Sequence, residues 1–198
     1  MIEDFQHVGG DLFLSGLVSS HGGNMSVRLG DRILITRRGS MIGHLGKRDM
    51  IETGLYENDS GIALASTELV VHRAIYRSTS ALAVVHAHPR VAIALSLLDD
   101  AIIPLDTEGS YLLHKVPVVA AEFSSGSTEL ADIIADALKN YKIAMLRGHG
   151  CFSTGQMLEE AYQWVSVLEE TSQIIYYSRL LRGEVKEYRK HSEAYKTW

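Results

Sequence analysis

The sequence predicts an α/β fold: a single domain in which helices lie on both sides of a mixed, largely antiparallel central sheet, as an α/β/α sandwich. Three observations support this prediction. Short apolar runs rich in β-branched residues alternate with longer amphipathic segments. The first two runs are joined by a tight Gly-Asp turn, which is typical of an antiparallel hairpin. The chain has 198 residues, 46% hydrophobic and 22% charged, which suits one globular domain.

The first half of the chain predicts a helix, a hairpin and short strands. Gly9 and Gly10 interrupt the amphipathic pattern of the first helix. In the hairpin we expect Met25, Val27 and Leu29 to face the core, because alternate residues of a strand point to one side. The expected elements are a helix over 2–18, strands over 25–29 and 32–36, a loop over 37–46, and short strands over 50–52 and 54–56.

The second half predicts alternating helices and strands. Ser66 and Thr67 supply hydroxyls that can cap the helix that follows them. Pro89 suits the first turn of a helix, since it needs no amide donor there. The expected helices cover 66–76, 89–98, 127–139 and 158–181, and the expected strands cover 84–88, 102–105, 116–119 and 143–146. The domain is expected to span 1–198, with 184–198 as a charged tail that also carries aromatic residues.

Charge and cysteine content narrow the possible functions. The net charge is −5, from 19 basic and 24 acidic residues without a basic block, so neither nucleic acid nor a membrane is an expected partner. Cys151 is the only cysteine, so no internal disulfide can form. No apolar window approaches the ~18 residues of a transmembrane helix. We therefore expect a cytoplasmic protein that acts on small molecules or on other proteins.

The stretch Val84-Val85-His86-Ala87-His88-Pro89 is the main candidate for chemistry. Residues two apart on a strand point to the same side, so both imidazoles would face one cavity. Such a pair can bind a metal ion, but on its own it is equally consistent with histidines satisfied in a core.

His149 and Glu68 are the candidates that would complete a metal site. His149 lies between two glycines after an apolar strand, and Glu68 lies at the start of a helix. Taken separately, the first pattern more often marks a turn and the second a favourable charge at a helix dipole. Together with His86 and His88 they form a donor set of the catalytic zinc type, with iron, cobalt and manganese as other possible ions.

Five motifs, in this order and near this spacing, resemble the class II aldolase/adducin head family over about residues 5 to 180. They are Gly22-Gly23-Asn24-Met25-Ser26-Val27-Arg28, Ile35-Thr36-Arg37-Arg38-Gly39, Ser66-Thr67-Glu68, Val85-His86-Ala87-His88 and Gly148-His149-Gly150. The resemblance implies the fold of that family.

The resemblance also implies roles for individual residues. His86, His88 and His149 match the zinc-binding histidines of the family, and Glu68 matches a carboxylate that is both a zinc ligand at rest and the acid/base near bound substrate. The positions that match the phosphate-binding residues are Gly23, Asn24, Gly39, Ser66 and Thr67. Backbone amides, hydroxyls and a helix N-terminus are suitable phosphate donors, although Gly22-Gly23-Asn24 alone would indicate an ordinary turn.

The resemblance implies a zinc-dependent aldolase, a carbon–carbon lyase of carbohydrate metabolism. Its substrate would be a ketose 1-phosphate similar to fuculose 1-phosphate, cleaved to dihydroxyacetone phosphate and an aldehyde. Glu68 favours an aldolase over the related epimerases, which typically carry Asp there. The alternatives are an epimerase, a methylthioribulose-phosphate dehydratase, a decarboxylase, or a non-catalytic interaction module like the adducin head. A homotetramer with active sites at its interfaces is also implied.

The sequence departs from the family pattern at two places. Arg38 stands where a hydroxyl residue usually precedes the glycine, and it could pair with phosphate, with a substrate carboxylate or only with solvent. The interfacial tyrosine of the family has no ungapped match, so Glu108 or Tyr111 is a candidate proton donor. Tyr188 or Tyr195 is a candidate for the C-terminal tyrosine of the family.

His72 and Cys151 are not expected to take part directly. His72 lies four residues after Glu68 and shares its helix face, but three histidines and Glu68 already complete the ligand set, so we expect a supporting or core position. Cys151 is expected to be structural, because nothing near it in the sequence would activate a thiolate.

Overall fold

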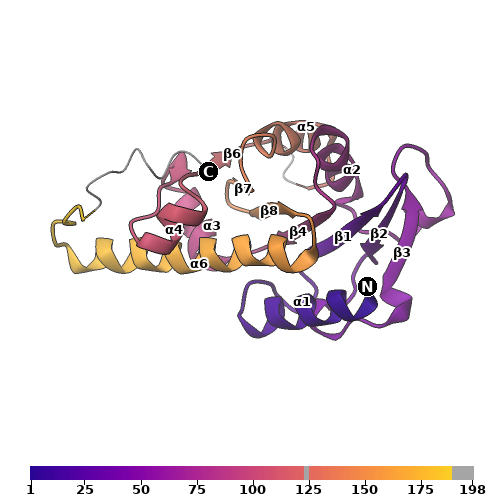
Figure 1. The fold of residues 1–198 in the computed structure, drawn as a ribbon, viewed down its shortest axis with the longest axis horizontal. Helices are drawn as coiled ribbons and strands as arrows, with labels where there is room; N and C mark the ends of the chain where they lie inside the picture. Colours follow the sequence, from indigo (N-terminus) through magenta and orange to yellow (C-terminus); the bar gives the residue numbers. More distant parts are fainter. Residues whose placement is uncertain (123–124, 189–198) are drawn as a thin grey trace.

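The computed structural model describes residues 1–122 and 125–188, and its centre is one sheet of eight strands in the order β3-β2-β1-β4-β8-β7-β6-β5 (Figure 1). Each neighbouring pair is antiparallel except β6 and β7, which are parallel. The strands are β1 Asn24–Leu29, β2 Arg32–Thr36, β3 Met50–Gly54, β4 Ala83–Ala87, β5 Ala101–Ile102, β6 Val116–Val119, β7 Ile143–Leu146 and β8 Gly150–Gly155. The mixed, largely antiparallel sheet is therefore confirmed.

Helices cover both faces of this sheet, which confirms the α/β/α sandwich. Helices α2 and α5 pack together on one face, and α1 and α6 lie on the other, with α3 and α4 packed against α6 (Figure 1). Each face has its own apolar core. The helices are α1 Ile2–Leu14, α2 Leu69–Ser78, α3 Arg90–Ser96, α4 Thr107–Leu112, α5 Thr128–Ala137 and α6 Leu158–Leu181, with short 3-10 turns at Ile42–His44, Lys47–Asp49 and Ser60–Ala63.

Strand β4 lies inside the sheet between β1 and β8, and all five of its residues are buried. Val84 belongs to the core beneath α2 and α5, whereas Val85 belongs to the opposite core. In the register, His86 pairs with Asn24 of β1 and Ala87 pairs with Cys151 of β8. The first residues of β1 and β8 are thereby placed beside the end of β4, where the histidines lie.

Several expected elements have different limits. The first helix ends at Leu14 and not at residue 18, and the chain then turns through Gly16, whose φ is +69°. Gly9, which weakens the helical pattern, lets this helix approach the turn at Ile42–His44, because a Cβ there would lie 2.3 Å from the carbonyl oxygen of Ile42. The helices expected over 66–76, 89–98 and 127–139 are α2, α3 and α5, and the helix over 158–181 is confirmed as α6.

Three predictions about strands were wrong. Leu29 does not face the core but is 38% exposed, because it ends β1 at the hairpin tip beyond the covering helices. The two short strands expected over 50–52 and 54–56 are replaced by one strand, Met50–Gly54. The amide of Gly54 donates to Asp59 in the following turn. The strand expected over 102–105 is limited to Ala101–Ile102, and the chain then enters α4, a helix that was not predicted.

The C-terminal segment is described as far as residue 188. Helix α6 ends at Leu181, and the capping residue Arg182 has a left-handed φ of +53°, just before the predicted stop at Gly183. The hydroxyl of Tyr188 accepts a hydrogen bond from Thr107 Oγ1 at 3.1 Å. Tyr195 and Trp198 lie outside the described residues. Across the described part of the chain, no helix combines the length and the apolar character that crossing a membrane requires.

Candidate active site

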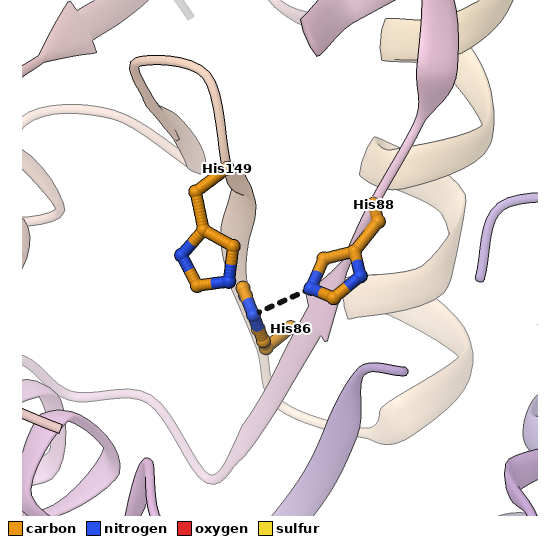
Figure 2. Close-up of side chains that lie close together, drawn as sticks. All are labelled: His86, His88 and His149. Atoms are coloured by element: carbon orange, nitrogen blue, oxygen red, sulfur yellow. Dashed lines mark hydrogen bonds between the residues drawn. The ribbon is translucent and has the colours of Figure 1, made fainter. Parts of the chain in front are cut away.

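The side chains of His86, His88 and His149 converge on one point beside the end of β4 (Figure 2). The three ring centroids are 4.8, 5.0 and 5.1 Å apart, and one possible ligand nitrogen from each ring lies within 4.8 Å of the others. Nε2 of His86 is 3.0 Å from Nε2 of His88. This confirms that the His-x-His pair faces one cavity and that His149 joins it.

The surroundings of these rings suit binding of a metal ion. The His86 ring stacks on Phe152, and its Nδ1 lies 2.9 Å from the carbonyl oxygen of Cys151, so that Nδ1 carries the proton and Nε2 keeps its lone pair. His149 directs one ring nitrogen toward His86 and His88, whereas its buried Nδ1, which has no hydrogen-bond partner among the described residues, points away from them (Figure 2). The nitrogen that faces the other two histidines is the one available to a metal ion.

Burial also keeps two of the rings neutral. It lowers the pKa of His86 well below the usual value for histidine, with further lowering from His88 and His149. Burial, followed by the neighbouring His149, lowers the pKa of His88 to about 4. Neutral imidazoles offer a lone pair to a metal without first losing a proton.

The β7–β8 turn brings His149 to the other two histidines. Gly148 has a φ of +69°, and its amide donates to Ser96 Oγ at 3.0 Å. Gly150 follows, and a Cβ there would lie 2.4 Å from the carbonyl oxygen of Ala87 and 2.7 Å from the His88 ring. The Gly-His-Gly sequence is therefore needed for close approach of this turn to β4.

The histidines form one end of a cavity of about 180 Å³. We call His86, His88 and His149 the histidine end. The rest of its wall includes the residues that the sequence assigns to phosphate, and we call these residues the donor end. It consists of Gly23, Asn24, Arg38, Gly39, Ser66 and Thr67, which come from three loops and, for Asn24, from the first residue of β1. The structure thus brings every predicted metal and phosphate residue to one cavity.

Local hydrogen bonds orient the donor end. Ser66 Oγ accepts from the amide of Glu68 at 3.3 Å, so its own proton remains available to a ligand. Gly23 has a φ of +75°, and a Cβ there would lie 2.7 Å from the carbonyl oxygen of His86. The glycine thus lets the loop before β1 lie directly against β4.

Glu68 lies on the wall of the same cavity, as the residue immediately before α2. It is only 4% exposed, and its carboxylate accepts hydrogen bonds from Ser125 Oγ at 2.8 Å and from the amide of Gly126 at 3.4 Å. Within the described residues, the cluster of possible metal ligands comprises the three histidines without Glu68. Glu68 is therefore held beside the histidine end by the loop before α5.

The two neighbouring arginines of the loop after β2 have different surroundings. Arg37 donates from Nε and Nη2 to Asp49 Oδ1, at 3.1 and 2.8 Å, and from Nη1 to the carbonyl oxygen of Arg38. The amide of Gly46, followed by Arg37, lowers the pKa of the Asp49 carboxyl. Arg38 is exposed at the cavity, and its guanidinium forms no hydrogen bond or ion pair with any described residue. Arg37 thus fixes the loop, and Arg38 remains available to an anion.

The two candidate proton donors do not line this cavity. Glu108 and Tyr111 lie on α4, which packs against α6, and Tyr111 is 42% exposed. The hydrogen bond between Tyr188 and Thr107 places the end of the described tail at the start of α4.

Ser125, Ser40, Arg37 and His21 also line the cavity and were not among the predicted site residues. His21 directly precedes Gly22 and Gly23 in the sequence, whereas Ser125 was missed because 57 residues separate it from Glu68. The run of serine and glycine before α5 is the signal that could have pointed to a ligand loop.

His72 and Cys151 are buried, as expected. His72 lies outside the histidine cluster, and its ring bonds to Asn24 and Ser26. Burial raises the pKa of the Cys151 thiol, so the side chain is an inert part of the core.

The sequence pattern that defines the Class II Aldolase and Adducin N-terminal domain matches residues 3–176. The chain belongs to this family. An L-fuculose phosphate aldolase from Methanococcus maripaludis is 34% identical over 160 residues, which cover 80% of this chain and 87% of that protein. The crystal structure of L-fuculose-1-phosphate aldolase from Thermus thermophilus has a TM-score of 0.87 and 42% identity, covering 94% of this chain and 97% of that one. The fold and the aldolase class are thereby confirmed.

Other members of the class II aldolase family have a different reaction in their names. A 3-oxo-tetronate 4-phosphate decarboxylase from Pectobacterium atrosepticum is 31% identical over 176 residues, which cover 85% of this chain and 80% of that protein. All of these names include a phosphate, which agrees with a phosphorylated small molecule as substrate.

Proposed function

We propose that this protein is a zinc-dependent aldolase that cleaves a ketose 1-phosphate, with fuculose 1-phosphate as the first substrate to test, to dihydroxyacetone phosphate and an aldehyde. The observation that carries this proposal is one cavity lined by three converging histidines and by the predicted phosphate donors, with Glu68 on its wall. Such a cavity suits a small molecule that presents carbonyl and hydroxyl oxygens to the histidines and a phosphate to the donors.

Zinc is the proposed ion, bound by His86, His88 and His149, with Glu68 as a fourth ligand at rest. The three converging ring nitrogens and the neutral rings of His86 and His88 support this donor set. When bound, a divalent ion would supply positive charge to stabilise the electrons that remain on the dihydroxyacetone phosphate half after the carbon–carbon bond breaks.

Glu68 is the proposed acid/base. Its carboxylate is buried on the cavity wall, and the bonds from Ser125 and Gly126 fix its position. In cleavage, Glu68 would deliver a proton to the carbon that loses the aldehyde, and in synthesis it would remove that proton. Burial away from bulk water suits a group that must exchange a proton with carbon and not with solvent.

The donor end is proposed to hold the phosphate. Gly23 and Gly39 offer backbone amides, Asn24 offers its side-chain amide, and Ser66 and Thr67 offer hydroxyls beside the N-terminus of α2. Arg38 adds a cation where a neutral hydroxyl was expected, so we propose that it pairs with the phosphate or with a second anionic group of the substrate.

A decarboxylase that acts on a phosphorylated 3-oxo acid is the second candidate. The guanidinium of Arg38, which is unpaired among the described residues, favours it, because such a substrate carries a carboxylate as well as a phosphate. A decarboxylase of this kind is also among the relatives. The epimerase, the dehydratase and the non-catalytic interaction module have no comparable support.

The proposal includes a homotetramer in the cytoplasm, built from one domain of residues 1–198 with 184–198 as its tail. Glu108 and Tyr111 do not line the cavity of their own chain, so either would act as proton donor only from a neighbouring subunit. In cleavage this group would take the proton from the hydroxyl whose oxygen becomes the aldehyde oxygen, and in synthesis it would donate a proton to that oxygen.

The deciding experiment is an assay of zinc-loaded protein on fuculose 1-phosphate, other ketose 1-phosphates and 3-oxo-tetronate 4-phosphate. We expect release of dihydroxyacetone phosphate from a ketose 1-phosphate, and a coupled enzyme that consumes dihydroxyacetone phosphate detects it. Release of carbon dioxide alone would replace the aldolase by the decarboxylase. Absence of both products together with absence of bound metal would instead support the interaction module.

A further inference from the structure

A buried chain of polar side chains leads from the α2 face of the sheet to the donor end of the cavity. Asn24 Oδ1 lies 2.6 Å from His72 Nε2, and His72 Nδ1 lies 2.6 Å from Ser26 Oγ. Ser26 Oγ in turn lies 2.7 Å from the hydroxyl of Tyr76. His72 and Ser26 are 0% exposed, Tyr76 is 1% exposed and Asn24 is 6% exposed, so water does not substitute for these bonds.

The chemistry of Asn24 fixes the direction of the first bond. Its Oδ1 can only accept, so Nε2 of His72 must donate. This bond occupies the carbonyl side of the amide and leaves the NH₂ side as the part that can reach a ligand. Asn24 lines the cavity and pairs with His86 across β1 and β4, so a donor here lies beside the histidine end.

We propose that His72 is a positioning residue, which holds the Asn24 amide with its NH₂ group toward the phosphate of the substrate. An asparagine amide that is not held can rotate by half a turn and present its carbonyl oxygen, which would repel a phosphate instead of binding it. This inference rests on the proposed phosphate-binding function of Asn24.

The rest of the chain explains why His72 is itself held. The hydroxyl of Tyr76 is shared between Ser26 Oγ at 2.7 Å and the carbonyl oxygen of Ser26 at 2.9 Å. Ser26 then bonds His72 Nδ1, which fixes the ring plane. His72 and Tyr76 are neighbours one turn apart on α2, the helix that Ser66, Thr67 and Glu68 precede. Helix α2 thereby helps to orient Asn24 as well as Ser66 and Thr67 at the cavity wall.

The test uses two variants of the zinc-loaded full chain that differ by one methylene. In His72→Gln the NH₂ group of the side chain can occupy the position of imidazole Nε2 and donate to Asn24. In His72→Asn the shorter side chain brings its amide only to the position of imidazole Nδ1, where it can bond to Ser26 but not to Asn24. We expect His72→Asn to weaken binding of inorganic phosphate, measured by calorimetry, about tenfold, as for loss of one hydrogen bond to a charged group, and His72→Gln to weaken it less than about threefold.

Two further variants separate positioning from general stability. Asn24→Ala should weaken phosphate binding about tenfold, and adding His72→Asn to it should cause no further loss, because His72 acts through Asn24. Tyr76→Phe should lower the melting temperature but weaken phosphate binding less than His72→Asn does, because Ser26 Oγ can still bond to His72 Nδ1. Equal losses in His72→Gln and His72→Asn, or additive losses with Asn24→Ala, would overturn the positioning role while leaving the proposed function intact. Unchanged phosphate affinity in Asn24→Ala would instead remove the proposed function of Asn24, and the inference with it.

A measurement on the wild-type protein covers the case in which a His72 variant does not fold. Nitrogen NMR of the imidazoles should show His72 protonated at Nε2, with a slowly exchanging proton. A ring protonated only at Nδ1 would contradict the proposal, because it could not donate to Asn24.

Discussion

The histidine end and the donor end of the cavity differ in what holds them in place. His86 and His88 lie at the end of the central strand β4, and His149 is held by a turn whose glycine contacts that strand. The donor end is assembled from three loops and the first residue of β1, and three of its members, Arg38, Gly39 and Thr67, are exposed. We therefore expect that the sheet fixes the proposed metal ion and hence the reaction class, whereas the loops set the choice of substrate.

The largest expected effect comes from removing a histidine. His86→Ala should lower kcat/KM by at least about 1000-fold, because the remaining two histidines leave the proposed ion without its full donor set. His7→Ala is the matched control, since His7 is an exposed residue of α1 and should leave the rate unchanged. Activity that survives His86→Ala would break the link between the histidine end and the reaction.

Glu68 lies on the wall of the same cavity, and its replacement should lower the rate without preventing metal binding. Glu68→Gln should lower kcat roughly 100- to 1000-fold, in the range of general acid–base catalysis, while the protein still binds zinc through three histidines. Glu129→Gln, at an exposed position in the first turn of α5, is the control. A variant with full kcat would show that the proton moves through another group.

Arg38 tests whether the donor end sets specificity. Arg38→Ala should raise KM for the phosphorylated substrate about tenfold, with little change in kcat, because a charge-assisted bond is lost in both the ground state and the transition state. The control is Arg48→Ala, an exposed arginine outside the cavity. Equal KM values in Arg38→Ala and Arg48→Ala would make Arg38 a charge paired only with solvent.

A smaller effect is expected on the stability of the metal-free protein. Burial lowers the folded pKa of His88 to about 4 and that of His72 to about 3, below the unfolded value near 6.5. Burial of the two neutral rings therefore does not reduce the free energy of unfolding above about pH 6.5. As the pH falls toward 4, the unfolded chain binds protons that the folded protein does not, and the free energy of unfolding decreases by up to about 1.4 kcal/mol per pH unit for each histidine. Denaturation in urea at several pH values measures this slope.

His88→Gln should make the free energy of unfolding depend less steeply on pH, because one of the two buried histidines is removed. His7→Gln, which changes an exposed residue, should leave this dependence unchanged. An unchanged slope in His88→Gln would mean that His88 keeps its proton in the folded protein, contrary to its burial.

The sequence was most informative where one short segment determines the geometry. A strand places alternate residues on one side, so Val84 to His88 was enough to predict that both imidazoles face one cavity. The regular apolar pattern over Leu158–Leu181 was enough to predict α6. Burial was harder to predict, since Leu29 fits the alternation of β1 yet lies at a hairpin tip that no helix covers.

Contacts between distant segments could not be read from the chain. The bond from Ser125 to Glu68 joins residues 57 positions apart, and no local pattern marks it. The bond from His72 to Asn24 joins residues 48 positions apart, so the sequence could place His72 near the site without showing what it does. The function of Glu108 and Tyr111 depends on a neighbouring subunit, which one chain does not determine.

The central claim is that the histidine end holds a metal ion, and a zinc titration of metal-free protein tests it most directly. We predict one zinc per chain in the wild type, with His86, His88 and His149 shown as ligands by their imidazole NMR signals, and much weaker binding in each single alanine variant at these positions. Absence of stoichiometric zinc binding, or binding that all three variants retain at wild-type affinity, would contradict the account.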